Sequence, residues 1–217
     1  MVKLEGCFRE VGLEVEYRTG KNLLPVILER FGGKGAMPPQ KTHRVDSYFF
    51  IHPETGGDCK RIRSVERYDS NGRPRKVYYQ SSKVYTNGNG DGGHAFEAQT
   101  EITEAEYKRL ARSRFQVVVE GDRSDLWIVE SRVTYSKPQK PGELHICIDK
   151  IHRLGDFTEF ELEIPGYDSM KPRQRNRERR EAERVIFEFA DQLGVPRGEL
   201  IMKTYPELLL EKAPKPK

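Results

Sequence analysis

Acidic residues recur at every second position in two segments of the sequence. Glu14 and Glu16 form the first set, and Glu159, Glu161 and Glu163 form the second. A repeat of two is that of a β-strand, so each set shares one strand face and the apolar residues between them take the other. Carboxylates on adjacent strands repel one another unless a cation neutralises them, and hard oxygen ligands select Mg²⁺ or Mn²⁺. The simpler alternative is that both charged faces are solvated.

Basic residues follow the same strand pattern. Arg61 and Arg63 flank Ile62, and Arg18 continues the face of the first acidic pair. Other candidate strands carry further cations, namely Lys76, Lys83 and Arg132. Cationic side chains that share a cavity with carboxylates indicate an anionic ligand bridged by a divalent metal, and a triphosphate meets that description. Cross-strand salt bridges on an exposed sheet would explain the same pattern, at little energetic gain.

The elements that must position these residues are mostly strands. Alternation and turn residues predict strands at 11–18, 43–51, 60–68, 75–86, 94–102, 115–120, 126–136, 143–151 and 157–164. Helical spacing predicts helices over 21–32, 103–113 and 171–193. The second helix begins with a capping box of Thr103 and Glu106, and the third carries an apolar stripe of Val185, Ile186, Phe189 and Leu193. We therefore expect a mostly β (α+β) fold, an antiparallel sheet or barrel with helices outside.

Composition narrows the class of protein. The 217 residues are 33% charged and 10% aromatic, and 38 basic against 34 acidic residues leave a net charge of +4. This balance disfavours a dedicated nucleic-acid binder, which needs a basic surplus. No apolar stretch suits a transmembrane helix or a signal peptide, and Cys7, Cys59 and Cys147 are too widely spaced for a disulfide framework. We expect a cytoplasmic protein with one domain over residues 1–211 and a frayed tail over 212–217.

Several motifs occur in a fixed order along the chain. In the N-terminal half they are Glu14-Val15-Glu16-Tyr17-Arg18, Asp46-Ser47-Tyr48-Phe49, Lys60-Arg61-Ile62-Arg63 and Tyr79-Gln80-Ser81-Ser82-Lys83. In the C-terminal half they are Asp149-Lys150-Ile151, Leu154-Gly155-Asp156-Phe157, Glu159-Phe160-Glu161, Leu193-Gly194-Val195 and Tyr205-Pro206-Glu207-Leu208-Leu209. This ordered set resembles the CYTH proteins of the triphosphate tunnel metalloenzyme superfamily, which include class IV adenylyl cyclases, thiamine triphosphatases and inorganic triphosphatases. Arg18 replaces the lysine of the family's ExExK hallmark.

The resemblance implies a structure and a set of roles. The fold would be an antiparallel, eight-stranded β-barrel whose tunnel is lined by charge. The implied metal ligands are Glu14, Glu16, Glu159 and Glu161. The implied triphosphate-binding residues are Arg18, Arg61, Arg63, Lys83 and Arg132. Catalytic roles would fall to Glu14, Glu16 and Lys83.

The implied function is hydrolysis of a triphosphate compound with Mg²⁺ or Mn²⁺, the substrate being inorganic triphosphate, thiamine triphosphate or a nucleoside triphosphate. The alternatives are a class IV-type adenylyl cyclase, an RNA 5′-triphosphatase and a non-catalytic module that binds polyphosphate or a nucleotide. The last alternative is motivated by Gln99, which stands where the family often has a second glutamate after Glu97. We expect a monomer or homodimer without a membrane partner; RNA is a less favoured ligand than a small molecule.

The remaining candidate groups receive structural interpretations. His145 alternates with Cys147 and Asp149 on a predicted strand, and no spacing typical of a zinc site surrounds it. The cysteines have no evident histidine neighbour in the sequence that would activate a thiol. The arginine-rich run within 171–184 is interpreted as a solvated helix face with i,i+4 ion pairs.

Overall fold

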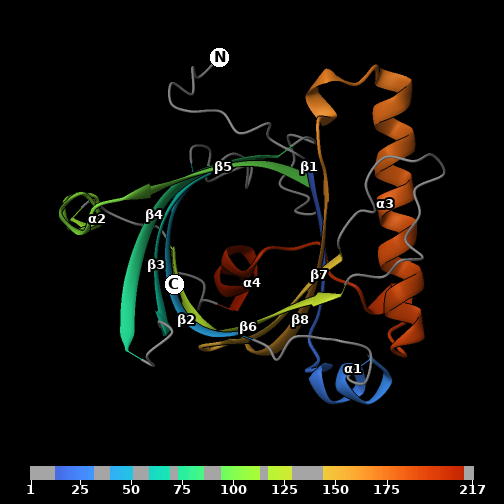
Figure 1. Cartoon of the computed structure of the whole chain (residues 1–217), viewed down its shortest axis with the longest axis horizontal. Coiled ribbons are helices and arrows are strands. Elements are labelled where there is room, and N and C mark those ends of the chain that lie inside the picture. Colours follow the sequence, from blue (N-terminus) through green and yellow to red (C-terminus); the bar gives the residue numbers. More distant parts are fainter. Residues whose placement is uncertain are drawn as a thin grey trace, which may run out of the picture.

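The strands close into a barrel. The computed structural model describes residues 13–31, 40–50, 59–68, 73–85, 94–112, 117–128 and 144–212. Within these ranges, eight antiparallel strands pair in the closed order β1-β5-β4-β3-β2-β6-β7-β8 (Figure 1). Their bounds are β1 Leu13–Thr19, β2 Gln40–Phe50, β3 Cys59–Tyr68, β4 Pro74–Tyr85, β5 His94–Ile102, β6 Val117–Ile128, β7 Leu144–Ile151 and β8 Gly155–Ile164. The predicted fold class is confirmed.

The barrel closes through β1, which pairs along its whole length with β8. On its other side it pairs with β5, and the pairs that lie within the described residues are Leu13 with Phe96, Glu14 with Ala95 and Val15 with His94. We call this β1–β5 pairing the seam. It joins segments about 80 residues apart in the chain, because the first strand lies between the last strand and the middle one.

The alternation in β1 explains which face turns inward. Leu13 and Val15 are completely buried on the outer face, whereas Glu16 and Arg18 on the opposite face line the barrel interior. The main apolar core therefore lies outside the barrel, between its wall and the helix α3 (Pro172–Gln192) (Figure 1). The sequence left open whether the charged strand faces meet solvent or line a lumen, and in the structure Glu16 and Arg18 line a lumen.

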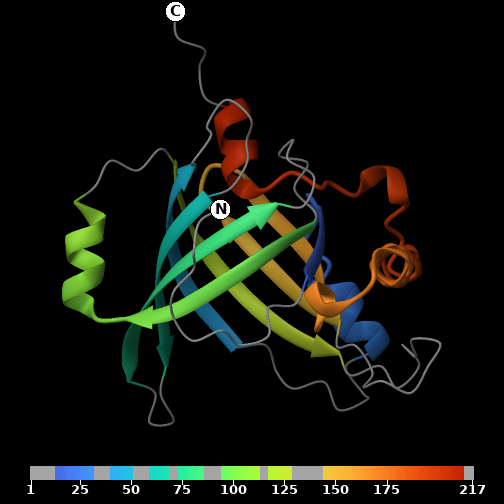
Figure 2. The same cartoon turned by 90° about the horizontal axis from the view of Figure 1, so that it is seen from above.

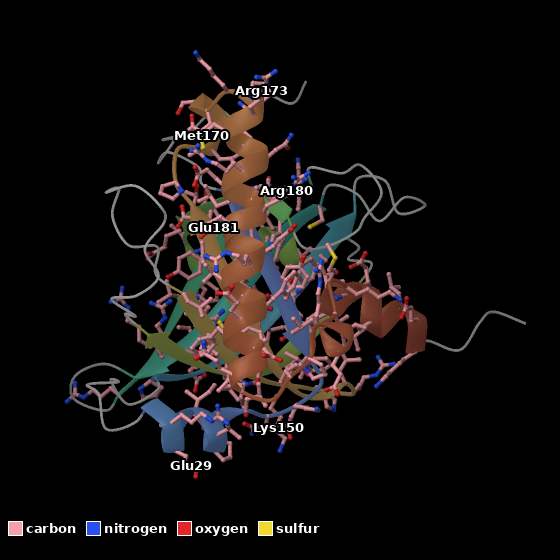
Figure 3. The ribbon with its side chains drawn as sticks, turned by 90° about the vertical axis from the view of Figure 1, so that its right-hand side faces the viewer. Glu29, Lys150, Met170, Arg173, Arg180 and Glu181 are labelled. Carbon is pink, nitrogen blue, oxygen red and sulfur yellow. The ribbon has the colours of Figure 1, made fainter. Side chains whose placement is uncertain are left out.

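Helix α3 supplies the other half of this core. Pro172 occupies its first turn, where a missing backbone N–H costs nothing. Its buried residues are Ala182, Ile186, Phe189 and Ala190. The Phe189 ring packs edge-on against Phe160 of β8 at a centroid distance of 6.2 Å. Figure 3 looks onto the outer side of α3, with Arg173 near its start and Arg180 and Glu181 farther along.

Charged residues on this outer side pair along the helix, as predicted from the sequence. Arg184 contacts Glu181 and Glu188, three and four residues away. The predicted buried stripe is correct for Ile186 and Phe189, whereas Val185 is only partly buried at its edge.

Helix α4 (Tyr205–Lys212) lies across one mouth of the barrel (Figures 1 and 2). Thr204 caps it, since its backbone N–H and hydroxyl donate to the Glu207 carboxylate. Tyr205 and Leu209 are buried in a second apolar cluster with residues of the barrel wall. The sequence analysis named no helix here, so α4 is an addition to the predicted architecture.

The remaining helices are short. They are α1 Leu24–Phe31, α2 Glu104–Ala111 and the 3₁₀ turns Tyr167–Ser169 and Arg197–Glu199. The Thr103–Glu106 capping box predicted for α2 is present in both directions. Among the described residues, no helix is both long enough and apolar enough to cross a membrane.

One strand prediction was wrong. The segments 115–120 and 126–136 were expected as separate strands. The structure has one continuous strand, β6, which pairs with β2 on one side and with β7 on the other. Gly121 sits in its middle because an added Cβ would lie 2.5 Å from the Lys150 carbonyl oxygen. Residues 129–136 of the predicted second strand lie outside the described ranges.

Ile186→Ala tests whether the helix–barrel core carries the fold. Ile186 is completely buried, so its truncation should lower the free energy of unfolding by about 2–5 kcal/mol. The measurement is equilibrium urea denaturation. Leu210→Ala is the control, since this leucine is 51% exposed and its loss should cost no more than about 0.5 kcal/mol. Equal effects of the two substitutions would contradict the placement of the core.

Candidate active site

The barrel interior holds one polar cavity of about 280 Å³. Every strand of the barrel contributes to its lining, and Thr204, Tyr205 and Pro206 line it where α4 begins. Charged side chains dominate the lining: Glu14, Glu16, Arg18, Arg44, Asp46, Arg61, Arg63, Lys83, Glu97, Asp122, Arg123, Asp149, Glu159 and Glu161. The charges among them that are buried are removed from bulk water, so each of those needs a close partner of opposite sign.

Three carboxylates from neighbouring strands converge in this cavity. Glu16 of β1 lies opposite Glu161 of β8 in the strand register, and Glu159 lies one lumen-facing position farther along β8. One oxygen of each lies within 4.8 Å of an oxygen of the other two. We call Glu16, Glu159 and Glu161 the acidic trio. Its members come from both acidic strands singled out in the sequence.

Lys83 and Arg18 both contact the acidic trio directly. The Lys83 Nζ atom lies 2.6 Å from Glu16 Oε1 and 3.2 Å from Glu14 Oε2. Arg18 spans two carboxylates, at 2.7 Å from Glu16 and 2.6 Å from Glu159. The ion pairs join β1, β4 and β8 around the lumen, so the charged groups also connect strands that are not neighbours.

A second cluster lies on β2 and β3. The Arg63 guanidinium donates two parallel hydrogen bonds of 2.7 Å to Asp46, a bidentate geometry. Arg61 lies 3.7 Å from the same carboxylate, donates to Ser81 Oγ at 3.1 Å and contacts Glu97. Both arginines are held by several partners, so their guanidinium groups are oriented before any ligand arrives.

A third cluster was not anticipated from the sequence. Arg123 of β6 donates to both oxygens of Asp149 at 2.6 Å and to Glu159 at 3.1 Å. The Tyr205 hydroxyl donates to Asp149 at 2.6 Å, which ties α4 to the barrel lining. The alternation of Val117, Val119, Gly121 and Arg123 could have placed Arg123 on the inner face of a strand. It was missed because β6 was predicted as two separate strands that excluded residues 121–125.

The cavity shifts the acid strength of its carboxyl groups in opposite directions. Burial raises the pKa of Glu14 well above its usual value, and the carboxylates of Glu97, Glu161 and Glu16 add to this against the opposing charge of Lys83. For Glu16 burial also acts upward, but Lys83 and Arg18 outweigh it and hold the pKa well below its usual range. Two carboxyl groups two residues apart therefore differ in proton affinity.

The donor set fits a hard divalent cation. The acidic trio offers three carboxylate oxygens in a small volume, which suits Mg²⁺ or Mn²⁺. Glu14 Oε2 is buried without a hydrogen bond of good geometry, although Lys83 lies within ion-pair distance. A cation beside it would favour its ionised form, so Glu14 is a fourth candidate ligand.

The structure brings nearly all sequence-predicted site residues into one cavity. Those that line it are Glu14, Glu16, Arg18, Arg61, Arg63, Lys83, Glu159 and Glu161. Arg132 lies outside the described residues. Lys76 and Glu163 do not line the cavity; Lys76 is exposed and lies 3.8 Å from Glu66. The further lining residues Asp46, Glu97, Arg123, Asp149 and Tyr205 had no assigned role.

Asp46→Asn tests how much the buried ion pairs of Asp46 stabilise the fold. Burial raises the pKa of Asp46, but Arg63 and Arg61 outweigh it and hold that pKa well below its usual value. A depressed folded-state pKa contributes stability above the unfolded pKa of about 3.9, and this stability is lost as pH falls through the folded pKa. The variant should lose roughly 3–5 kcal/mol at neutral pH, because two buried arginines lose their shared carboxylate.

The measurement is urea denaturation at about pH 7 and about pH 3. The Asp46→Asn variant should lose less stability than the parent chain between these pH values, because it lacks one titrating group. The exposed Asp156 supplies the control, Asp156→Asn, which should keep the parent's pH dependence. An unchanged pH dependence in Asp46→Asn would refute the stabilising ion pair.

Comparisons with known proteins agree with the fold. No protein-family model and no curated protein matches the chain. Among solved structures, PH1819 from Pyrococcus horikoshii OT3 is 20% identical with a TM-score of 0.60, over 92% of this chain and 99% of that one. A conserved hypothetical protein from Pyrococcus furiosus is 19% identical with a TM-score of 0.60, over 90% of this chain and 99% of that one.

A third structure, of a candidate adenylate cyclase from Vibrio parahaemolyticus, is 15% identical with a TM-score of 0.59, over 91% of this chain and 98% of that one. At these identities the likeness concerns the fold. It extends over almost the full length of each neighbour. The chain therefore has an overall fold like that of these proteins, and its closed antiparallel barrel is the architecture that the resemblance of its motifs predicted.

Proposed function

We propose that this chain binds a triphosphate compound in the barrel cavity and hydrolyses its terminal phosphate with the help of Mg²⁺ or Mn²⁺. The observation that carries the proposal is the meeting of the acidic trio with a ring of cations in one enclosed cavity. Carboxylates alone would suit a metal, and cations alone would suit an anion. Both together suit a polyanion that arrives with a divalent metal.

The cations of the cavity are arranged to hold an extended anion. Arg61 and Arg63 lie on one strand and are fixed by Asp46 on the neighbouring strand. Planar guanidinium groups bind phosphate oxygens in pairs, so these two residues suit the binding of adjacent phosphate groups. Lys83 lines the same cavity from β4, the strand next to β3 in the barrel.

Lys83 and Arg18 would change partners when the site is loaded. In this structure both donate to Glu16, whose oxygens a metal would also take. Displaced from Glu16, the two cationic groups can turn toward phosphate oxygens. A bound Mg²⁺ or Mn²⁺ would supply further neutralisation of the charge that develops on the phosphate oxygens.

Glu14 is suited to accept a proton from the attacking water. Its Oε2 atom is buried, and burial raises its pKa well above that of an ordinary carboxyl group. A base works best when its pKa lies near the working pH. Lys83, 3.2 Å from Oε2, would keep the carboxylate ionised and oriented before the transfer.

The position of α4 bears on how a ligand enters. This helix lies across one mouth of the barrel, and its first residues line the cavity (Figure 2). A ligand that enters from the opposite side would present its terminal phosphate to the deep end of the cavity. A cyclase requires attack at the α-phosphorus. This arrangement instead supports attack at the terminal phosphorus.

A second candidate function is binding without turnover. Gln99 lies 3.5 Å from an Arg61 nitrogen, at a position where the resemblance would allow a carboxylate. Loss of that charge weakens the negative side of the cavity and leaves the cations in place. A module of this kind would bind polyphosphate or a nucleotide without strict dependence on a metal.

A product assay distinguishes these functions. The chain is incubated with inorganic triphosphate, thiamine triphosphate, ATP or a 5′-triphosphate RNA, each with Mg²⁺, with Mn²⁺ and with a chelator. Metal-dependent release of phosphate is the expected result. Pyrophosphate together with cyclic AMP would instead identify a cyclase. Binding without any product would overturn the proposed hydrolysis in favour of the binding module.

Glu16→Gln is the matching substitution in the acidic trio. It removes the charge of a central metal ligand and should lower metal-dependent phosphate release by about 100-fold, since electrostatic groups of this kind contribute roughly 10²–10³ in rate. Glu163→Gln is the control, because this residue continues the same strand face but is exposed and outside the cavity. Full activity in Glu16→Gln would remove the acidic trio from the mechanism.

Arg61→Ala tests the anion-binding side of the cavity. Loss of its charge-assisted hydrogen bonds, worth about 1.5–3 kcal/mol, should weaken binding of inorganic triphosphate by about 10- to 100-fold. Isothermal titration with Mg²⁺ present measures this affinity. Lys76→Ala removes an exposed cation on β4 outside the cavity and should leave the affinity unchanged. Unchanged affinity in Arg61→Ala would exclude this residue from the binding site.

A further inference from the structure

One group of side chains in the barrel differs in chemistry from the oxygen ligands of the acidic trio. His145 and Cys147 of β7 lie beside Glu161 of β8, and one ligand atom of each lies within 4.8 Å of those of the other two. His145 is the register partner of Glu161, so adjacent strands hold these two side chains at one level of the barrel. The alternation of His145 and Cys147 on one strand was visible in the sequence, and the structure adds Glu161 of the neighbouring strand to this pair.

The two separations from the His145 nitrogen to the other two donor atoms are close to those of a tetrahedral metal site. His145 Nδ1 lies 3.8 Å from Cys147 Sγ and 3.6 Å from Glu161 Oε2. With zinc bond lengths of ~2.3 Å to sulfur and ~2.0–2.1 Å to nitrogen and oxygen, a tetrahedron places sulfur ~3.5 Å and oxygen ~3.4 Å from the nitrogen. The observed distances differ from these by a few tenths of an ångström, which small side-chain rotations can supply.

The three donors also select a particular class of metal. Mg²⁺ and Mn²⁺ prefer oxygen ligands, whereas a thiolate with an imidazole favours zinc and similar borderline or soft ions. We infer that His145, Cys147 and Glu161 form a zinc site, separate in chemistry from the acidic trio. Three protein ligands leave one coordination position for water or another ligand, which is typical of zinc sites that are not purely structural.

The zinc site and the acidic trio share Glu161. His145 and Glu161 both line the cavity, so the fourth position can face its interior, whereas Cys147 is completely buried behind them. The barrel would then hold a soft-ligand site directly beside a hard-ligand site. The zinc inference does not depend on the proposed hydrolysis, because it concerns metal binding without a substrate.

Zinc and cobalt binding by the full-length chain test this inference. Co²⁺ replaces Zn²⁺ in such sites and gives a thiolate-to-metal charge-transfer band in the near ultraviolet when sulfur is a ligand. Added Co²⁺ should produce this band with one metal per chain, and Zn²⁺ should abolish it. Substitution of a residue that merely hydrogen-bonds to a metal ligand lowers metal affinity by roughly 10–100-fold. Because Cys147 would be a ligand itself, Cys147→Ser should weaken Zn²⁺ binding by about 100-fold or more.

Matched variants separate the two sites. Cys59→Ser removes the other described buried cysteine and should keep the charge-transfer band. Glu16→Gln removes a carboxylate of the acidic trio that the zinc site does not use, and should keep the band as well. His145→Ala provides a second test if Cys147→Ser fails to fold, as thermal melting would show. Undiminished Zn²⁺ affinity in either variant of the zinc site, or cobalt binding without the charge-transfer band, would overturn the inference.

Discussion

Charge inside the barrel must be neutralised within the barrel. The lumen removes carboxylates and guanidinium groups from bulk water, and an unpaired ion there would cost several kcal/mol. Each cluster accordingly combines groups of both signs, as with Arg63 and Asp46 or Arg123 and Asp149. The partners lie on different strands, so pairing is achieved only in the correct register. A shift by one residue would turn the charged face outward and the apolar face into the lumen.

This constraint explains why the apolar core lies outside the barrel. Strands with one charged and one apolar face can satisfy both faces if the charged faces enclose a polar cavity and helices cover the outside. Helix α3 supplies that cover over β1 and β8, the two strands that carry the acidic trio. Tight packing against Leu13, Val15 and Phe160 thereby fixes the backbone positions from which Glu16 and Glu159 reach inward. The stability of the core and the geometry of the site depend on the same strands.

Local patterns in the sequence were sufficient to predict the strands, but they did not predict which side chains contact one another. The period of two predicted β1 and β8 and the sharing of a face by Glu14, Glu16 and Arg18. It could not show that Arg18 would reach Glu159 or that Arg123 would reach Asp149, because the register between distant strands depends on the closed barrel. The need for glycine at position 121 was hidden for the same reason, since it comes from the Lys150 carbonyl on another strand. The role of Tyr205 required knowledge that α4 crosses a barrel mouth.

The seam has a consequence for how the barrel assembles and fluctuates. Val15 of β1 pairs with Leu162 of β8 on one side and with His94 of β5 on the other, so closure must bring together three segments that are far apart in the chain. Contacts of such long sequence separation form late and slowly, because the loop entropy is lost before the pairing is gained. Among the described residues the seam comprises three residue pairs, and Glu14 belongs to one of them. Transient local separation of β1 from β5 would open the lumen beside Glu14 while the other strand pairings stay intact, and exchange of the amide hydrogens along the seam with solvent reports this motion.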